Sequence, residues 1–95
     1  MLEQINLLNI PNQNFTFDGL ENTFEITLRT TILNDLIMDL KVGDKYSFYS
    51  KMCVDRQDLL LTTLNKEKLY FVDTKGQTNP NYKEFNDRYI LIYES

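Results

Sequence analysis

The sequence predicts an all-β protein, a small antiparallel barrel or sandwich of about seven to eight short strands with at most one short helical turn. Alanine, the strongest helix former, is absent from the 95 residues. β-Branched residues, six tyrosines and six phenylalanines instead make up about a third of the chain, a composition that suits pleated, half-buried strands. No repeat, linker or low-complexity tract interrupts it, so we expect residues 1–95 to form a single domain.

The clearest strand covers residues 23–32. Every second residue from Phe24 onward is apolar or threonine, and those between are polar or charged, which is the pattern of a strand with one wet face. Ahead of it, two phenylalanines alternate with polar residues in segment 14–17, which runs into Asp18 and Gly19. Because Asp-Gly tolerates the positive φ angles of a hairpin or bulged turn, we expect the two segments to pair antiparallel.

A second hairpin is predicted next along the chain. The apolar segment 36–40 leads into a turn at Gly43 and Asp44, and an aromatic alternation follows over residues 46–50. Residues 58–61 are compatible with either a strand or one helical turn, because short apolar runs cannot be assigned by periodicity alone.

Two further strands are predicted near the C-terminus, at residues 69–72 and 88–93. The last strand is apolar on both sides. Its faces carry Tyr89, Leu91 and Tyr93 on one side and Ile90 and Ile92 on the other.

Between these strands, residues 73–82 are rich in turn formers, which predicts a surface loop of about ten residues and a natural site for contact. Asp73, Asn79 and Asn81 offer oxygen atoms around Gly76, as a calcium site would. Their spacing does not match an EF-hand loop, which favours an ordinary turn with Asx-type hydrogen bonds. We expect no metal and no cofactor.

Charge and hydropathy limit the partners. Ten basic and fourteen acidic residues give a net charge of -4, which argues against sequence-specific or phosphate-mediated binding of nucleic acid. No apolar run approaches the roughly eighteen residues that would cross a bilayer, and no secretion signal is recognisable. We therefore expect a soluble protein that does not contact a membrane.

Catalytic candidates are few, and we expect a protein that is not an enzyme. Histidine is absent, so a nucleophile lacks its commonest general base. Cys53, the single cysteine, lies in an apolar run and is expected to be buried, the alternative being a thiolate activated by Lys51 or Arg56. Asp55 and Asp58 flank Arg56, which suggests a solvated polar turn rather than an acid–base pair. A small hydrolase using these aspartates or Asp73 is the enzymatic alternative.

The aromatic residues allow two interpretations. They can form a core and a protein interface, or a stacking platform for oligonucleotides or oligosaccharides on a small barrel. The acidic balance favours the first. The chain also has more bulky apolar residues than a small core conceals, which predicts a homo-oligomer. The aromatic residues that allow these two interpretations are Tyr46, Phe48, Tyr49, Tyr70, Phe71, Tyr89 and Tyr93.

The order of these signals resembles the phage baseplate plug family, small proteins of contractile-tailed bacteriophages and of Mu-like or P2-like prophages. The similarity covers residues 10–93. It rests on Ile10-Pro11-Asn12-Gln13-Asn14-Phe15, Asp18-Gly19, Leu36 to Leu40, Asp58-Leu59-Leu60, Leu69-Tyr70-Phe71-Val72-Asp73-x-x-Gly76 and Asn79-Pro80-x-Tyr82-x-x-Phe85-Asn86-x-Arg88-Tyr89-x-Leu91-x-Tyr93.

The resemblance implies a structural subunit of the tail baseplate, at the junction of tube and spike hub, assembled in the bacterial host cytoplasm and acting by contact with other baseplate, tube or hub proteins. From residue type alone we expect exposed tyrosines and the loop 73–82 to make these contacts. The expected contact residues are Tyr46, Tyr49, Tyr70, Asp73, Asn79, Pro80, Tyr82 and Tyr93. The expected turn residues are Asp18, Gly19, Gly43, Asp44 and Gly76.

Overall fold

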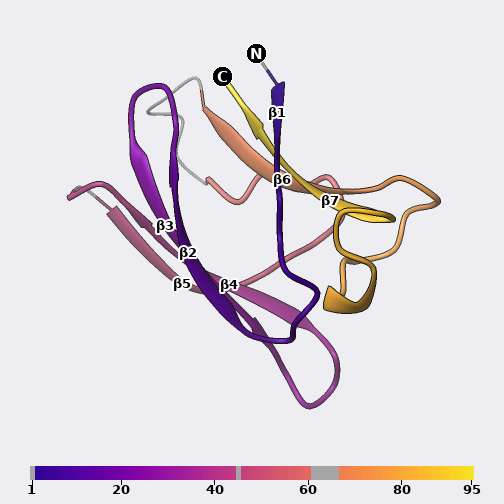
Figure 1. Ribbon diagram of the computed structural model, residues 1–95. Coiled ribbons are helices and arrows are strands. Elements are labelled where there is room, and N and C mark those ends of the chain that lie inside the picture. The colour runs from indigo at the N-terminus through magenta and orange to yellow at the C-terminus, as the bar shows by residue number, and fades with distance from the viewer. Residues whose placement is uncertain (1, 45, 61–66) are drawn as a thin grey trace.

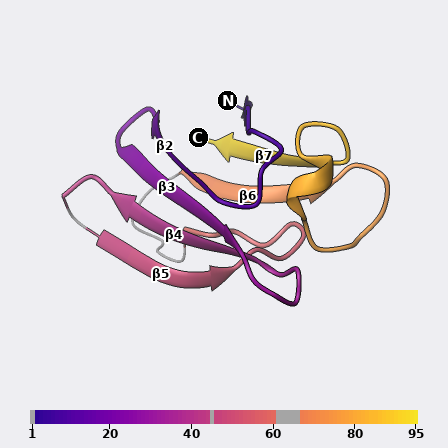
Figure 2. The same cartoon turned by 60° about the horizontal axis from the view of Figure 1, so that its bottom comes forward.

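The computed structural model describes residues 2–44, 46–60 and 67–95 (Figure 1). Within them the chain forms seven strands and one 3-10 helix, which confirms the all-β prediction. The strands make two antiparallel sheets that lie one above the other (Figure 2). Of the two architectures that the sequence leaves open, barrel and sandwich, the structure is therefore the sandwich.

The larger sheet has four strands in chain order. They are β2 (Gln13–Asp18), β3 (Thr23–Thr30), β4 (Leu36–Val42) and β5 (Tyr46–Met52). Both predicted hairpins are present, since β2 pairs antiparallel with β3 and β4 with β5. The alternation places the core face correctly, because the even-numbered residues from Phe24 to Leu28 are buried.

The smaller sheet has the order β1-β7-β6, with β1 (Leu2–Ile5), β7 (Tyr89–Glu94) and β6 (Lys68–Asp73). β7 is its central strand, and it buries one apolar face while the other is half-buried, as the sequence predicts. β1 was not predicted. Only Ile5 of its four residues is buried, so the segment carries no alternation by which a strand could be recognised.

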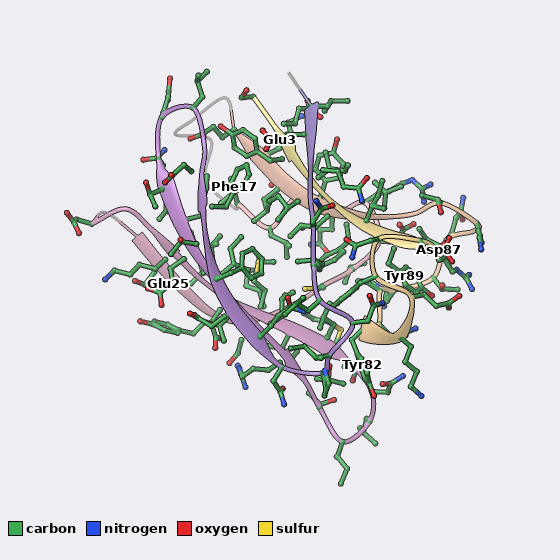
Figure 3. The ribbon with its side chains drawn as sticks, viewed as in Figure 1. Glu3, Phe17, Glu25, Tyr82, Asp87 and Tyr89 are labelled. Carbon is green, nitrogen blue, oxygen red and sulfur yellow. The ribbon has the colours of Figure 1, made fainter. Side chains whose placement is uncertain are left out.

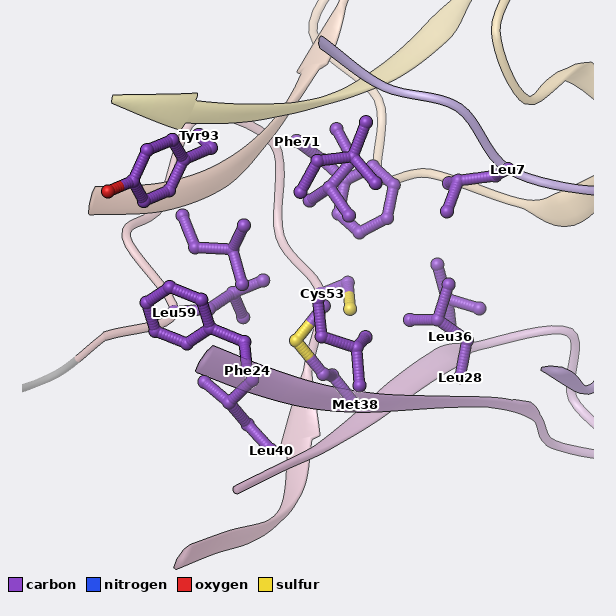
Figure 4. Close-up of a cluster of buried hydrophobic side chains, with 14 of the residues drawn as sticks. Leu7, Phe24, Leu28, Leu36, Met38, Leu40, Cys53, Leu59, Phe71 and Tyr93 are labelled. Carbon is purple, nitrogen blue, oxygen red and sulfur yellow. The ribbon is translucent and has the colours of Figure 1, made fainter. Parts of the chain in front are cut away.

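One hydrophobic core fills the space between the two sheets (Figure 4). Phe24, Leu28 and Met38 project from the larger sheet, and Phe71 and Tyr93 from the smaller one. Cys53 lies in this core, as predicted, and its burial raises the pKa of the thiol to about 12.

Segment 53–60 connects the sheets and runs along the outer edge of β6. The backbone N–H of Cys53 donates to Leu36 O at 2.9 Å, beside β4. Further on, the N–H of Arg56 donates to Phe71 O and that of Leu59 to Leu69 O, each at 2.7 Å. These bonds cover an edge that would otherwise be open. Leu59 and Leu60 are buried, and they lie in neither a strand nor a helix. Leu61, the last residue of the predicted run, lies outside the described residues.

Two predicted boundaries were wrong. The strand expected over 23–32 ends at Thr30, and Ile32 is fully exposed in the following turn. The loop expected over 73–82 is part of a longer connection, residues 74–88, which contains the 3-10 helix η1 (Tyr82–Glu84). In both cases the local sequence pattern predicts that a turn is present, but it does not predict the residue at which the strand pairing ends.

The core predicts a clear contrast between two leucines. Leu28→Ala should lower the free energy of unfolding by about 2–5 kcal/mol, because it leaves a cavity between the sheets. Leu33→Ala, at a side chain that is 80% exposed, should change it by less than about 0.5 kcal/mol. Urea denaturation of the two variants measures both values, and equal effects would contradict the placement of the core.

Candidate interaction site

The connection between β6 and β7 is organised around Asp73, whose side chain is 1% exposed. Arg88 donates to it from Nε at 2.8 Å and from Nη2 at 3.0 Å. The backbone N–H groups of Lys75 and Thr78 donate to it as well, each at 2.9 Å. Since these donors favour the charged carboxylate, with Arg88 contributing most, the pKa of Asp73 lies below its usual range. These bonds fix the connection between β6 and β7 to the end of β6.

Asp55 and Arg56 hold the same loop from the other side. Asp55 accepts a hydrogen bond from the N–H of Asp73 at 2.7 Å and forms an ion pair with Arg56. Arg56 also donates to Gly76 O at 3.3 Å, and Asn79 Oδ1 accepts from the N–H of Asp55 at 3.2 Å. The loop is consequently a rigid element with an exposed tip over residues 74–79.

The expected solvated turn at Asp55 and Asp58 is wrong in one respect. Arg56 does reach a carboxylate, but Asp55 is largely buried, with its side chain 9% exposed. Asp58 accepts from the N–H groups of Leu60 and Leu69, at 3.0 and 3.1 Å. Each carboxylate therefore binds backbone groups of its own and positions chain segments. The described residues contain no group of three or more His, Cys, Asp or Glu side chains that could hold a metal ion.

The predicted contact residues are not brought together on one surface. Tyr49 on β5 is 75% exposed, and Tyr82 is half-buried against the core. Tyr70 is half-buried and donates to Glu94 Oε1 at 2.7 Å, a bond that raises its pKa. The Tyr46 side chain lies outside what the structure describes. Asp73, Pro80 and Tyr93 are buried, so they present almost no surface to a partner, whereas Asn79 is exposed.

Tyr93 instead completes a buried polar cluster. Its hydroxyl donates to Glu67 and accepts from the N–H of Leu20 at 2.7 Å. Asn22 donates to the other oxygen of Glu67 at 2.6 Å. Burial, and then the bond to Glu67, raise the pKa of Tyr93. Glu67 was missed from the sequence, because it stands between two lysines and looks like a solvated surface residue.

This cluster also explains one of the predicted turn glycines. Gly19 lies in the turn between β2 and β3, where its N–H donates to Asn22 O at 2.8 Å. A Cβ atom there would lie 2.7 Å from Glu67 and 2.8 Å from Phe24 and Tyr93. The glycine is required by this close approach and not by a positive φ.

The other predicted turn residues lie in or beside turns, and each has its own structural role there. Gly43, in the turn before β5 with Asp44, has a φ of 53°. Asp18 is the last residue of β2 and accepts from the hydroxyl of Thr23 at 2.9 Å. Gly76, at the tip of the loop, would place a Cβ 3.3 Å from Asp73 and Arg88.

The aromatic side chains considered for a stacking platform do not all lie on the surface. Phe71, Tyr89 and Tyr93 lie in the core between the sheets, so their rings are unavailable for stacking on a ligand. Figure 3 shows how Phe17, Tyr82 and Tyr89 lie at separate places on the molecule. What the surface does expose is a set of large apolar side chains, Leu2, Leu8, Ile10, Leu20, Ile32, Leu33, Tyr49 and Met52.

The family described as cyanophage baseplate Pam3 plug gp18 matches residues 2–95. No curated protein matches the chain. The described part of the chain also has no helix with the length and apolar character needed to pass through a membrane.

The Asp73 site predicts a pH dependence. Because folding lowers the pKa of this carboxyl, its contribution to stability is complete above the ordinary value of about 3.9 and is lost as the pH falls from there toward the folded-state pKa. Asp73→Asn should lower the denaturation midpoint at pH 7 and flatten the loss of stability between about pH 5 and pH 2. Asp87→Asn is the matched control. Asp87 is exposed, and its Oδ2 lies 3.7 Å from Lys75 Nζ in an ion pair that solvent screens. If both variants followed the wild-type pH curve, the site would not stabilise the fold.

The Tyr93 cluster predicts a second effect on stability. Tyr93→Phe should reduce the free energy of unfolding by about 1–3 kcal/mol, because Glu67 and the N–H of Leu20 lose a partner inside the protein. Tyr49→Phe, at an exposed ring, should leave it unchanged. Thermal or urea unfolding compares the two, and a neutral Tyr93→Phe would argue against the cluster.

Proposed function

The chain belongs to the baseplate plug family of cyanophage Pam3 gp18, which makes it a phage baseplate protein, and we propose that it is a plug or hub-associated subunit at the junction of tube and spike. The match over residues 2–95 carries this proposal, because it spans nearly all of the sequence. In this role the protein works by occupying an interface between tail proteins, after assembly in the cytoplasm of the bacterial host. Catalysis has no part in it.

The internal hydrogen bonding supports a structural role. Asp55, Asp58 and Asp73 are the carboxylates named in the enzymatic alternative, and each is bonded to neighbouring groups of the fold. Such bonds stabilise a fixed surface rather than a reactive one. The anchored loop 74–88 is one rigid element that neighbouring proteins can contact.

Exposed apolar residues support association with other chains. Single exposed leucines are ordinary, but this small protein exposes large apolar side chains on several strands and turns. We include contact between copies of the chain in the proposal, because baseplates have rotational symmetry and identical subunits close rings through repeated contacts.

Light scattering tests the proposal. The purified chain should associate with itself, or form a defined complex when mixed with the tube, hub or spike proteins of the same phage. The mass of each species after size exclusion gives the stoichiometry. A strict monomer that binds none of these proteins would overturn the proposed role.

A further inference from the structure

The edges of the smaller sheet are protected against further pairing. The outer edge of β6 receives hydrogen bonds from the N–H groups of Arg56 and Leu59, each at 2.7 Å. β1, at the other edge, has only four residues and carries the charged Glu3. Covering an edge, shortening it and placing a charge on it are common ways in which a protein keeps its sheet from acquiring a foreign strand.

The edges of the larger sheet lack such protection over most of their length. β2 has no charge and no proline over residues 13–17, and β5 has none over residues 46–50. Asp18 and Lys51 come only at or near the last position of their strands. Among the described residues, β2 and β5 each pair with one strand, and β5 forms the lower margin of the molecule in Figure 2. The two edges are therefore open to a further strand.

Aromatic side chains at both edges are only half-buried. Phe15 and Phe17 on β2 and Phe48 on β5 pack against the core, yet none of the three is fully buried. Phe15 and Phe48 are the two ends of one row across the sheet, with Ile26 and Leu40 between them. A strand added at either edge would place side chains beside these rings and extend the row.

The two open edges are complementary to each other. Three successive antiparallel pairings make β2 and β5 run in opposite directions. A second copy placed beside the first in the same orientation therefore brings its β2 antiparallel to β5. Gln13 binds Leu8 through its side chain, and Ser50 interrupts β5 with a φ of 58°. The runs that remain for pairing are residues 14–17 and 46–49, which are equal in length.

We propose that residues 46–49 of β5 pair antiparallel with residues 14–17 of β2 in a second copy, so that the larger sheets of successive copies join into a ring. At this register Phe48 lies opposite Phe15 of the next copy, and the row across the sheet continues from chain to chain. Pairing of β5 with β5 would leave every β2 edge open, whereas head-to-tail pairing uses both edges. The inference rests on the proposed function and names the contact between copies.

Two double variants that differ at one position test this contact. Ser47 and Thr16 are exposed, and the proposed register places Ser47 opposite Thr16 of the next copy. Within one chain they stand at opposite edges of the sheet, about 14 Å apart across three strand spacings. The like-charge variant carries Ser47→Lys and Thr16→Lys, and the opposite-charge variant carries Ser47→Lys and Thr16→Glu. The new charges therefore face each other only between copies.

Analytical ultracentrifugation of the full chain measures the affinity between copies. The wild-type chain should form an oligomer of one defined mass, as a closed ring does. The like-charge variant should dissociate at a concentration at least about tenfold higher than the opposite-charge variant. Raising the salt to about 500 mM should reduce this difference to less than about threefold.

The pair of variants controls for two other effects of charge. The like-charge variant lowers the net charge from -4 to -2, whereas the opposite-charge variant leaves it at -4, so repulsion between whole molecules would change the affinities in the opposite direction. Thr16 stands opposite Glu25 within the chain, so the added lysine suits the fold better than the added glutamate does. Thermal unfolding should confirm that both variants are folded, since the replaced side chains are exposed.

The outcomes separate the two proposals. If both variants associate equally well, β5 does not pair with β2 of the next copy, and the inference is overturned while the proposed function stands. If the chain stays monomeric but binds a tube, hub or spike protein, and either variant weakens that binding, the edge receives a foreign strand and the inference is overturned in the same way. A monomer that binds none of these proteins overturns both proposals.

Discussion

The structure depends on two carboxylates buried at the two ends of β6. Glu67 directly precedes the strand and Asp73 is its last residue. Glu67 binds Tyr93 and the turn between β2 and β3, while Asp73 binds Arg88 and the loop 74–88. Two sheets of three and four strands have little area with which to hold each other. The bonds of the Glu67 cluster join the two sheets at one end of β6, and the bonds of Asp73 hold the loop 74–88 to the other end of the same strand.

The sequence predicts the elements whose residues face a core and fails where long-range contacts decide. Regular alternation reveals β3, because burial of one face imposes it. β7 is recognised instead as a continuous apolar run, which fits a strand that is buried on one face and half-buried on the other. β1 has one buried residue and gives no such signal. The end of β3 is set by a turn around Asn34, and the alternation simply continues through Ile32.

The polar sites could be predicted only in part, for a related reason. Asp73 was recognised as a turn residue, but its burial depends on Arg88, which lies fifteen positions away. Glu67 is acceptable inside the protein because Tyr93 and Asn22 satisfy both of its oxygens, and both partners come from distant strands or turns. Resemblance to a family identified the biological setting.

The burial of Cys53 has a practical consequence. Its thiol stays protonated at neutral pH and lies between the sheets, so an alkylating reagent reaches it only when they separate. As the single cysteine of the chain, it is a natural reporter of such openings, and the rate of alkylation would record how strongly assembly into a larger particle suppresses them.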